Sequence, residues 1–268
     1  MHDTNPELFN LAMSPEAQPL LDAVKKHIAE NVDPISDEFY TLQKEKDDPW
    51  VWHPKQLELL EGAKQKAREA GLWNFFLPSS EIGKGLNNLD YAYIATELGK
   101  SPLSSQTLNC SAPDTGNMEV LERVGTPEQQ ETWLKPLLEG EIRSAYAMTE
   151  PHVASSDASN IETSAVLDGD DWVINGEKYY ISGAGDPRCK IMIVMVKTSP
   201  EAEPYRQQSQ ILVPMDTPGV EVLGPMMVYG DPHAPHGHMH IKFSRRRQGC
   251  TAPTCVPAVC GPDFSAEG

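Results

Sequence analysis

The sequence predicts an α+β protein in which an all-helical domain is followed by a β domain. Up to Gly140, apolar residues recur at intervals of three and four, which is the spacing of one buried helix face. Beyond Gly140, apolar and polar residues alternate, as they do in strands with one buried face. The 268 residues are enough for one large or two ordinary domains. We therefore expect a helical domain over 1–140 and a β domain over 141–243.

The first two predicted helices have clear boundaries. Residues 15–32 follow Ser14 as a cap, with Pro15 in the first turn, where a proline is tolerated. The second helix follows Pro54 and ends at Gly71, because glycine suits the left-handed position after a helix. Both segments carry one apolar stripe, which we expect to be buried.

Two further helices are expected over 87–99 and 126–140. The first opens at one of the two asparagines at its start and ends at a glycine. The second opens with Thr126, a proline at the first helical position and Gln129 at the third, which is the pattern of a capping box.

The β domain begins with a predicted hairpin. Residues 161–167 alternate between apolar and polar types, and the turn-forming segment 168–171 separates them from the apolar residues 172–174. Further strands are predicted at 190–197, 210–214, 220–223 and 238–243. Residues 244–268 show neither period, so we expect an irregular tail.

Charge and composition exclude several classes of protein. Lys and Arg number 22 and Asp and Glu number 39, which gives a net charge of −17. Such a chain lacks the clustered positive charge that nucleic-acid binding needs. No apolar run approaches the roughly 18 residues of a membrane span. Without a targeting signal, the expected compartment is the cytoplasm, or mitochondria or peroxisomes in a eukaryote.

Cysteines and histidines suggest metal sites that we do not favour. Cys250, Cys255 and Cys260 lack the paired close spacing of zinc ligands, and five cysteines in a chain of this size imply no disulfide framework. Four histidines cluster in the segment 233–240. Imidazole is a common metal ligand, but polar lining of a site or plain surface is the favoured interpretation.

A hydroxyl-rich loop follows a predicted strand at residues 146–157. Its small residues and hydroxyls suit the close approach of main-chain N–H groups to an electron-rich ligand. From this segment alone, a plain polar turn is equally compatible with the pattern.

The loop, together with the segment 175–184 and the run from Gly125 to Pro151, resembles the acyl-CoA dehydrogenase family. The resemblance extends from about Ser14 to Phe243. It implies an N-terminal helical domain, an antiparallel β-barrel-like middle domain and a C-terminal four-helix bundle, with FAD between the last two. This chain has no match to the bundle, and the tail resembles an altered ending from a frameshift, an altered splice or a gene-model error.

The resemblance also implies roles for individual residues. The FAD-binding positions that it matches are Tyr146, Met148, Thr149, Tyr180, Ile181 and Ser182. Main-chain donors near Met148 and Thr149 would stabilise negative charge on the reduced flavin. Ser156, or Ser155 in the alternative alignment, falls where the family contacts coenzyme A. The loop departs from the family pattern, since His152 and Val153 replace small residues. No residue matches the family's catalytic glutamate, which lies on the bundle, and the family needs no metal.

Two classes of function follow from these patterns. The first is an FAD-dependent acyl-CoA dehydrogenase that acts on an acyl-CoA substrate, passes electrons to an electron-transfer flavoprotein-type acceptor and forms a homo-oligomer. Within this class, an oxidase relative would use oxygen as the acceptor. The present chain by itself is expected to bind FAD weakly or not at all and to be inactive. The second class is a non-catalytic truncated product that binds a partner.

Overall fold

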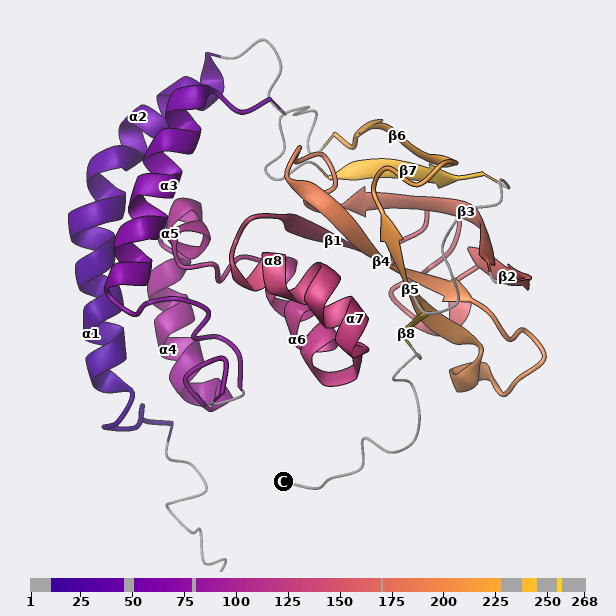
Figure 1. Cartoon of the computed structure of the whole chain (residues 1–268), viewed down its shortest axis with the longest axis horizontal. Coiled ribbons are helices and arrows are strands. Elements are labelled where there is room, and N and C mark those ends of the chain that lie inside the picture. Colours follow the sequence, from indigo (N-terminus) through magenta and orange to yellow (C-terminus); the bar gives the residue numbers. More distant parts are fainter. Residues whose placement is uncertain are drawn as a thin grey trace, which may run out of the picture. The chain divides into compact units, whose positions relative to one another are not determined.

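The computed structural model describes residues 11–45, 51–78, 81–169, 171–227, 238–244 and 255–256 (Figure 1). The chain divides into two compact units between Thr115 and Gly116. The first unit holds α1 (Gln18–His27), a π-helical turn (Ile28–Val32), α2 (Asp33–Lys44), α3 (Pro54–Glu69), α4 (Asn88–Leu98) and α5 (Pro102–Thr107). The helix α6 (Asp114–Val124) begins at the boundary. The all-helical N-terminal region is confirmed.

Local chemistry explains where α3 begins and ends. The His53 side chain accepts a hydrogen bond from the main-chain N–H of Lys55, and Gln56 Oε1 accepts one from the N–H of His53. Gly71 follows the helix with φ +68°, the left-handed conformation predicted for it. On the buried side, Leu60 joins the core of the unit.

The first helical segment is longer than predicted, because it continues through Pro34 to the end of α2. Proline lacks an N–H and its ring clashes with the carbonyl four residues earlier in a regular helix. The preceding π-turn avoids this clash, since Asp33 N–H bonds to the carbonyl of Ile28, five residues back. The prediction of Ser14 as the cap is wrong: its N–H and hydroxyl both donate to Asp90, at 2.7 and 2.8 Å.

A π-turn directly before a helix with a proline in its first turn occurs in the second unit as well. The helix predicted at 126–140 consists of α7 (Pro127–Gln129), a π-turn (Gln130–Leu134) and α8 (Lys135–Leu138). Here the N–H of Lys135 bonds to the carbonyl of Gln130, directly before Pro136. The predicted capping box is confirmed, with Thr126 accepting from Gln129 N–H and donating its own N–H to the Gln129 side chain.

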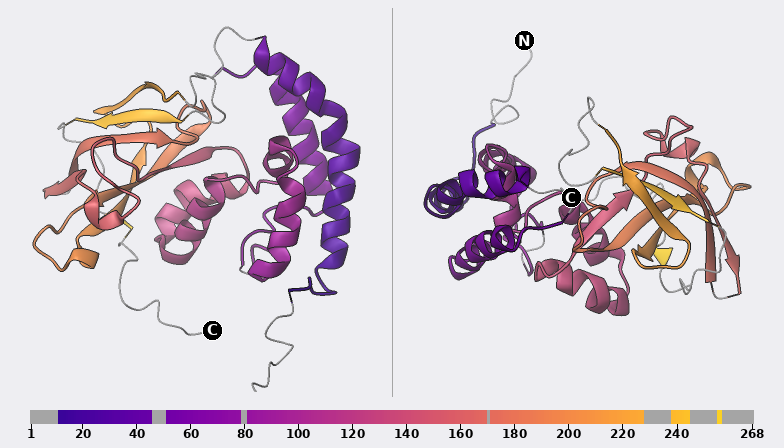
Figure 2. Two further views of the ribbon diagram at one scale, coloured as in Figure 1. Left: turned by 180° about the vertical axis from the view of Figure 1, so that it is seen from behind. Right: turned by 90° about the horizontal axis from the view of Figure 1, so that it is seen from above.

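The second unit is built on one curled sheet (Figure 2). Its strands are β1 (Arg143–Ala147), β2 (Ser164–Asp168), β3 (Asp171–Ile181), β4 (Cys189–Lys197), β5 (Gln208–Pro214), β6 (Val220–Pro225), β7 (Met239–Phe243) and β8 (Cys255–Val256). The strand order is β6-β7-β3-β2-β4-β5-β8, and β1 pairs with β4. The predicted hairpin and strands are confirmed, and the fold is the expected helical region followed by a β domain.

Most neighbouring strands are antiparallel, but β1 and β2 both run parallel to β4. The apolar β4 is buried along nearly its whole length, as expected for a central strand. Asn117 on α6 donates to Ser144 Oγ at 2.8 Å and to the carbonyl of Ala145 at 3.1 Å, which fastens this helix to β1. The predicted irregular tail lies outside the described residues, apart from Ser244 and the two residues of β8.

Within the described ranges, the structure contains no helix that is both long and apolar enough to span a lipid bilayer.

Candidate functional site

The residues that follow β1 lie beside the end of β3, although the two segments are 30 residues apart in the sequence. The N–H of Tyr179 donates to the carbonyl of Thr149 at 2.9 Å. The Lys178 ammonium donates to the carbonyl of Met148, also at 2.9 Å. We call residues 148–150 with residues 178–180 the β1–β3 junction. It brings together three of the predicted site residues: Met148, Thr149 and Tyr180.

Tyr180 has an unusual conformation in this junction. Lys178 pairs with Ile241 and Ile181 with Met239, so two residues of β3 lie opposite one residue of β7. At this bulge Tyr180 has φ +57°, which is strained for an aromatic residue, and its side chain is 42% exposed. Thr149 is exposed as well. Ile181 is buried.

The other predicted cofactor residues make their contacts elsewhere in the same unit. Ser182 Oγ lies 2.8 Å from Nδ1 of His238, at the start of β7. The Tyr146 hydroxyl accepts a hydrogen bond from Gln210 on β5 at 3.2 Å. Both side chains are half-buried. Ser182 therefore follows the junction along the chain but is held by a different partner.

A buried ion pair lies beneath the junction. The Lys178 side chain is fully buried, and its ammonium lies 2.8 Å from Oε1 of Glu150. Glu150 also accepts hydrogen bonds from the N–H groups of Glu162 and Thr163, at 2.8 and 2.9 Å. Burial raises the pKa of Glu150, but the hydrogen bonds from Lys178, Thr163 and Glu162 outweigh it and hold the pKa below its usual value. Burial lowers the pKa of Lys178 to about 8, against the opposing effect of Glu150.

Sequence reasoning missed this pair, although a signal was present. Lys178 lies four residues after Ile174 on the same strand, so a period of two places it on the buried face. A lysine at a buried strand position needs a partner. The partner is Glu150, in the loop that follows β1.

The two candidate serines of the loop have different environments. Ser155 is buried, and its hydroxyl accepts a hydrogen bond from the N–H of Glu150 at 2.7 Å. Ser156 is exposed. Of the two hydroxyls predicted to contact a substrate, only that of Ser156 is open to a ligand.

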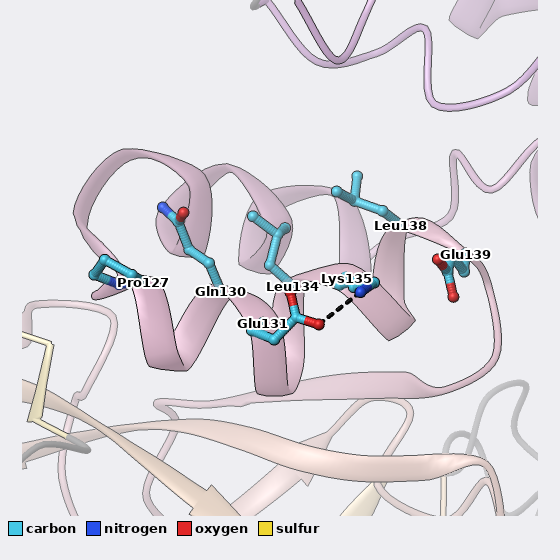
Figure 3. Close-up of a pocket in the computed structure, with 7 residues that line it drawn as sticks. All are labelled: Pro127, Gln130, Glu131, Leu134, Lys135, Leu138 and Glu139. Atoms are coloured by element: carbon cyan, nitrogen blue, oxygen red, sulfur yellow. Dashed lines mark hydrogen bonds and ion pairs between the residues drawn. The ribbon is translucent and has the colours of Figure 1, made fainter.

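Two pockets lie outside the predicted cofactor positions. The first has a volume of about 270 Å³ and is lined by Glu150, Pro151, His152, Glu162, Thr163, Asn175, Gly176 and Glu177. The second, of about 370 Å³, follows the surface of α7 and α8 (Figure 3). Figure 3 shows Leu134 and Leu138 beside an ion pair between Glu131 and Lys135, 2.6 Å apart. This second pocket holds no residue predicted for the site.

The histidine cluster lies partly outside the described residues, which exclude His233 and His236. His240 Nε2 lies 3.2 Å from a carboxylate oxygen of Glu177, whose other oxygen is 3.5 Å from Lys242. Among the residues that the structure describes, no three His, Cys, Asp or Glu side chains are placed to hold a metal ion.

Comparison with protein families gives two adjoining matches. The acyl-CoA dehydrogenase N-terminal domain model matches residues 14–141, and the acyl-CoA dehydrogenase middle domain model matches residues 145–243. Acyl-CoA dehydrogenase family member 10 from Mus musculus is 47% identical over 236 residues, which are 86% of this chain and 22% of the mouse protein. The chain spans 22% to 31% of the length of three such curated relatives.

Solved structures show the same relationship. A structure described as an acyl-CoA dehydrogenase from Mycobacterium abscessus matches with a TM-score of 0.84 and 43% identity, over 91% of this chain and 61% of that one. A glutaryl-CoA dehydrogenase from Mycobacterium smegmatis, solved in complex with FADH2, matches with a TM-score of 0.66 and 21% identity. That match covers 94% of this chain and 58% of the other, and it shows a shared fold.

Proposed function

The chain belongs to the acyl-CoA dehydrogenase family, and we propose that it forms the FAD-facing part of an enzyme that oxidises the Cα–Cβ bond of an acyl-CoA thioester. In this proposal residues 1–140 are the N-terminal domain, residues 141–243 are the middle domain, and the tail from 244 lies outside the family pattern. The observation that carries the proposal is the hydrogen bond from Tyr179 N–H to the Thr149 carbonyl. It joins the two segments whose motifs match the cofactor site of the family.

The side chains at the β1–β3 junction fit a flavin. An exposed aromatic ring in a strained conformation at Tyr180 offers a flat face, and the exposed Thr149 hydroxyl offers a donor at its edge. Bound FAD supplies the oxidising group that accepts hydride from the substrate. Met148 and Thr149 would hold the pyrimidine edge of the ring through main-chain N–H groups fixed in advance, which is how donors stabilise developing negative charge.

The remaining predicted residues complete the proposed cofactor site. Ser182 and the main chain of Ile181 would approach the central part of the flavin, and Tyr146 would line the same pocket. For the substrate, the exposed hydroxyl of Ser156 would contact the coenzyme A portion, while the buried Ser155 would support the loop from within. The acyl-CoA substrate, the electron-transfer flavoprotein-type acceptor and a homo-oligomeric state belong to the whole protein in this proposal. Its compartment would be the cytoplasm, or mitochondria or peroxisomes in a eukaryote.

Titration of FAD into the 268-residue chain tests the proposal. We expect weak, saturable quenching of flavin fluorescence, and an affinity about tenfold lower in Tyr180→Asn, because loss of an aromatic stacking contact is worth roughly one power of ten. Asparagine tolerates the left-handed conformation, so this variant should fold. Tyr205→Asn, which removes a tyrosine that is 79% exposed on the same unit, is the control.

The outcomes separate the alternatives. An FAD affinity that is equal in Tyr180→Asn and the unsubstituted chain would overturn the proposal. We further propose that these 268 residues do not turn over acyl-CoA by themselves. An assay with an artificial electron acceptor checks this, and detection of hydrogen peroxide would instead indicate an oxidase.

A further inference from the structure

Glu150 and Lys178 do more than form an ion pair, because these two residues make hydrogen bonds to the start, the middle and the end of the loop between β1 and β2. Lys178 donates to the carbonyl of Met148 at the start of the loop. Glu150 receives the N–H groups of Glu162 and Thr163 at its end. The N–H of Glu150 donates to the hydroxyl of Ser155 in the middle.

Stability alone does not account for this arrangement. Burial of a carboxylate and an ammonium costs more free energy than their attraction returns in many proteins, and apolar residues of similar volume serve stability as well or better. A surface loop is normally free to vary in conformation. Here the Lys178 side chain is fully buried and that of Glu150 is only 5% exposed, so the buried side of the loop is held by an ion pair.

The position of the pair indicates what it supports. Lys178 and Tyr179 are neighbours on β3, and they bond to the carbonyls of Met148 and Thr149. Each of these two carbonyls is thereby fixed on the side facing β3. Because a peptide group is planar, the 148–149 and 149–150 peptide groups are fixed with them, including the N–H of Thr149.

We propose that Glu150 and Lys178 are positioning residues, which set the main chain of Met148 and Thr149 for contact with the cofactor. This inference rests on the proposed function for the contact itself. The fixation of the main chain is a property of the chain without cofactor, and it is measurable separately.

The test compares three variants: Lys178→Met, Glu150→Gln and the double variant. Lys64→Met is the matched control, because Lys64 is also a buried lysine and lies 2.7 Å from Glu61, but on α3 in the other unit. The first readout is hydrogen exchange of the amides of Tyr179, Glu162 and Thr163 in the cofactor-free chain. Amides in the β4–β5 ladder serve as the internal reference for global unfolding. The second readout is FAD affinity.

We expect Lys178→Met to speed exchange of the Tyr179 amide by about tenfold relative to the reference, since one hydrogen bond from a charged group is typically worth at least that factor. Each single variant leaves one buried group of the pair without its partner and should lower the resistance to urea. The double variant should recover most of that resistance. It should not recover the protection of the Tyr179 amide, because methionine cannot donate a hydrogen bond to the Met148 carbonyl. FAD affinity should fall with the amide protection and not with global stability. Lys64→Met should leave the protection of the Tyr179 amide and the FAD affinity unchanged.

Unaltered Tyr179 protection in Lys178→Met would overturn the inference, as would full recovery of protection in the double variant. If the variants lose protection but retain the FAD affinity of the unsubstituted chain, the positioning role is also excluded. An FAD affinity that is equal in Tyr180→Asn and the unsubstituted chain would instead overturn the proposed function, and the exchange data would still decide whether the pair fixes the loop.

Discussion

At the residue scale, Glu150 shows how hydrogen bonds decide the charge state of a buried group. Its carboxylate is only 5% exposed, which by itself favours the neutral acid. The ammonium of Lys178 and two main-chain N–H groups favour the anion more strongly, so the pKa lies below its usual value. Because the folded state holds the proton less tightly than the unfolded chain, the stabilisation is present above about pH 4.5 and is lost as the pH falls.

This sign leads to a prediction for acid unfolding. The free energy of unfolding, measured with urea between about pH 7 and pH 3, should fall more steeply in the unsubstituted chain than in the Glu150→Gln/Lys178→Met double variant, because that variant has neither the carboxylate that gains a proton nor a buried lysine left without its partner. The double variant Glu131→Gln/Lys135→Met removes an exposed ion pair on the surface of α7–α8 and is the control. Parallel curves for the unsubstituted chain and the first double variant would contradict the prediction.

At the element scale, two glycines differ in what their missing side chain permits. A Cβ atom on Gly176 of β3 would lie 2.5 Å from Thr163 Oγ1 and 2.8 Å from Thr163 Cα, so β3 approaches the end of the loop closely only because this residue is glycine. Gly62 in α3 has open space around the equivalent position. Thr163 also donates its N–H to Glu150, so the close approach at Gly176 supports the site.

Alanine at these two positions should act in opposite directions. We expect Gly176→Ala to lower the free energy of unfolding by about 1–3 kcal/mol, as overpacking does. Gly62→Ala should raise it by about 0.5–1 kcal/mol, because alanine is the better helix former. Urea unfolding at neutral pH measures both. An unchanged or raised stability in Gly176→Ala would show that Thr163 can move aside.

The elements that the sequence predicted well are those whose signals are local. The capping box at Thr126, the glycine after α3 and the turn of the β2–β3 hairpin each lie within a few residues of the boundary that they define. The continuation of the helix through Pro34 was not predicted, because a proline normally ends a helix and the compensating π-turn has no sequence signature of its own.

The candidate site divides in the same way. The meeting of the two motif segments was expected from the family resemblance, and the hydrogen bond from Tyr179 N–H to the Thr149 carbonyl joins them. The Glu150–Lys178 pair, the contact of Ser182 with His238 and the parallel pairing of β1 with β4 join residues far apart in the chain. Periodicity gives the face on which a residue lies but not its partner on another element, so these contacts required the structure.

At the scale of the whole molecule, the net charge of −17 is large for 268 residues. Like charges on a compact chain repel one another and oppose folding. Added salt weakens this repulsion, because the screening length falls from about 30 Å at 0.01 M to about 10 Å at 0.1 M ionic strength.

We therefore expect the midpoint of thermal unfolding at pH 7.5 to rise by a few degrees when NaCl is raised from about 0.01 M to about 0.1 M. Differential scanning calorimetry measures this. The control is the same pair of salt concentrations close to the sequence pI of 4.8, where the effect should shrink because the net charge is small. A midpoint at pH 7.5 that is constant or falls with salt would contradict the prediction.

The parallel pairing of β1 with β4 also has a consequence for biosynthesis. Residues of β1 pair with partners as far along the chain as Val194, so β1 leaves the ribosome several seconds before its neighbour at typical rates of roughly 5–20 residues per second. During that interval the strand has no ladder to join, and Met148 and Thr149 have no fixed neighbour. A chain that ends before Val194 would therefore lack part of the strand that pairs with β1, and the unpaired N–H and C=O groups of β1 would be open to pairing with another chain.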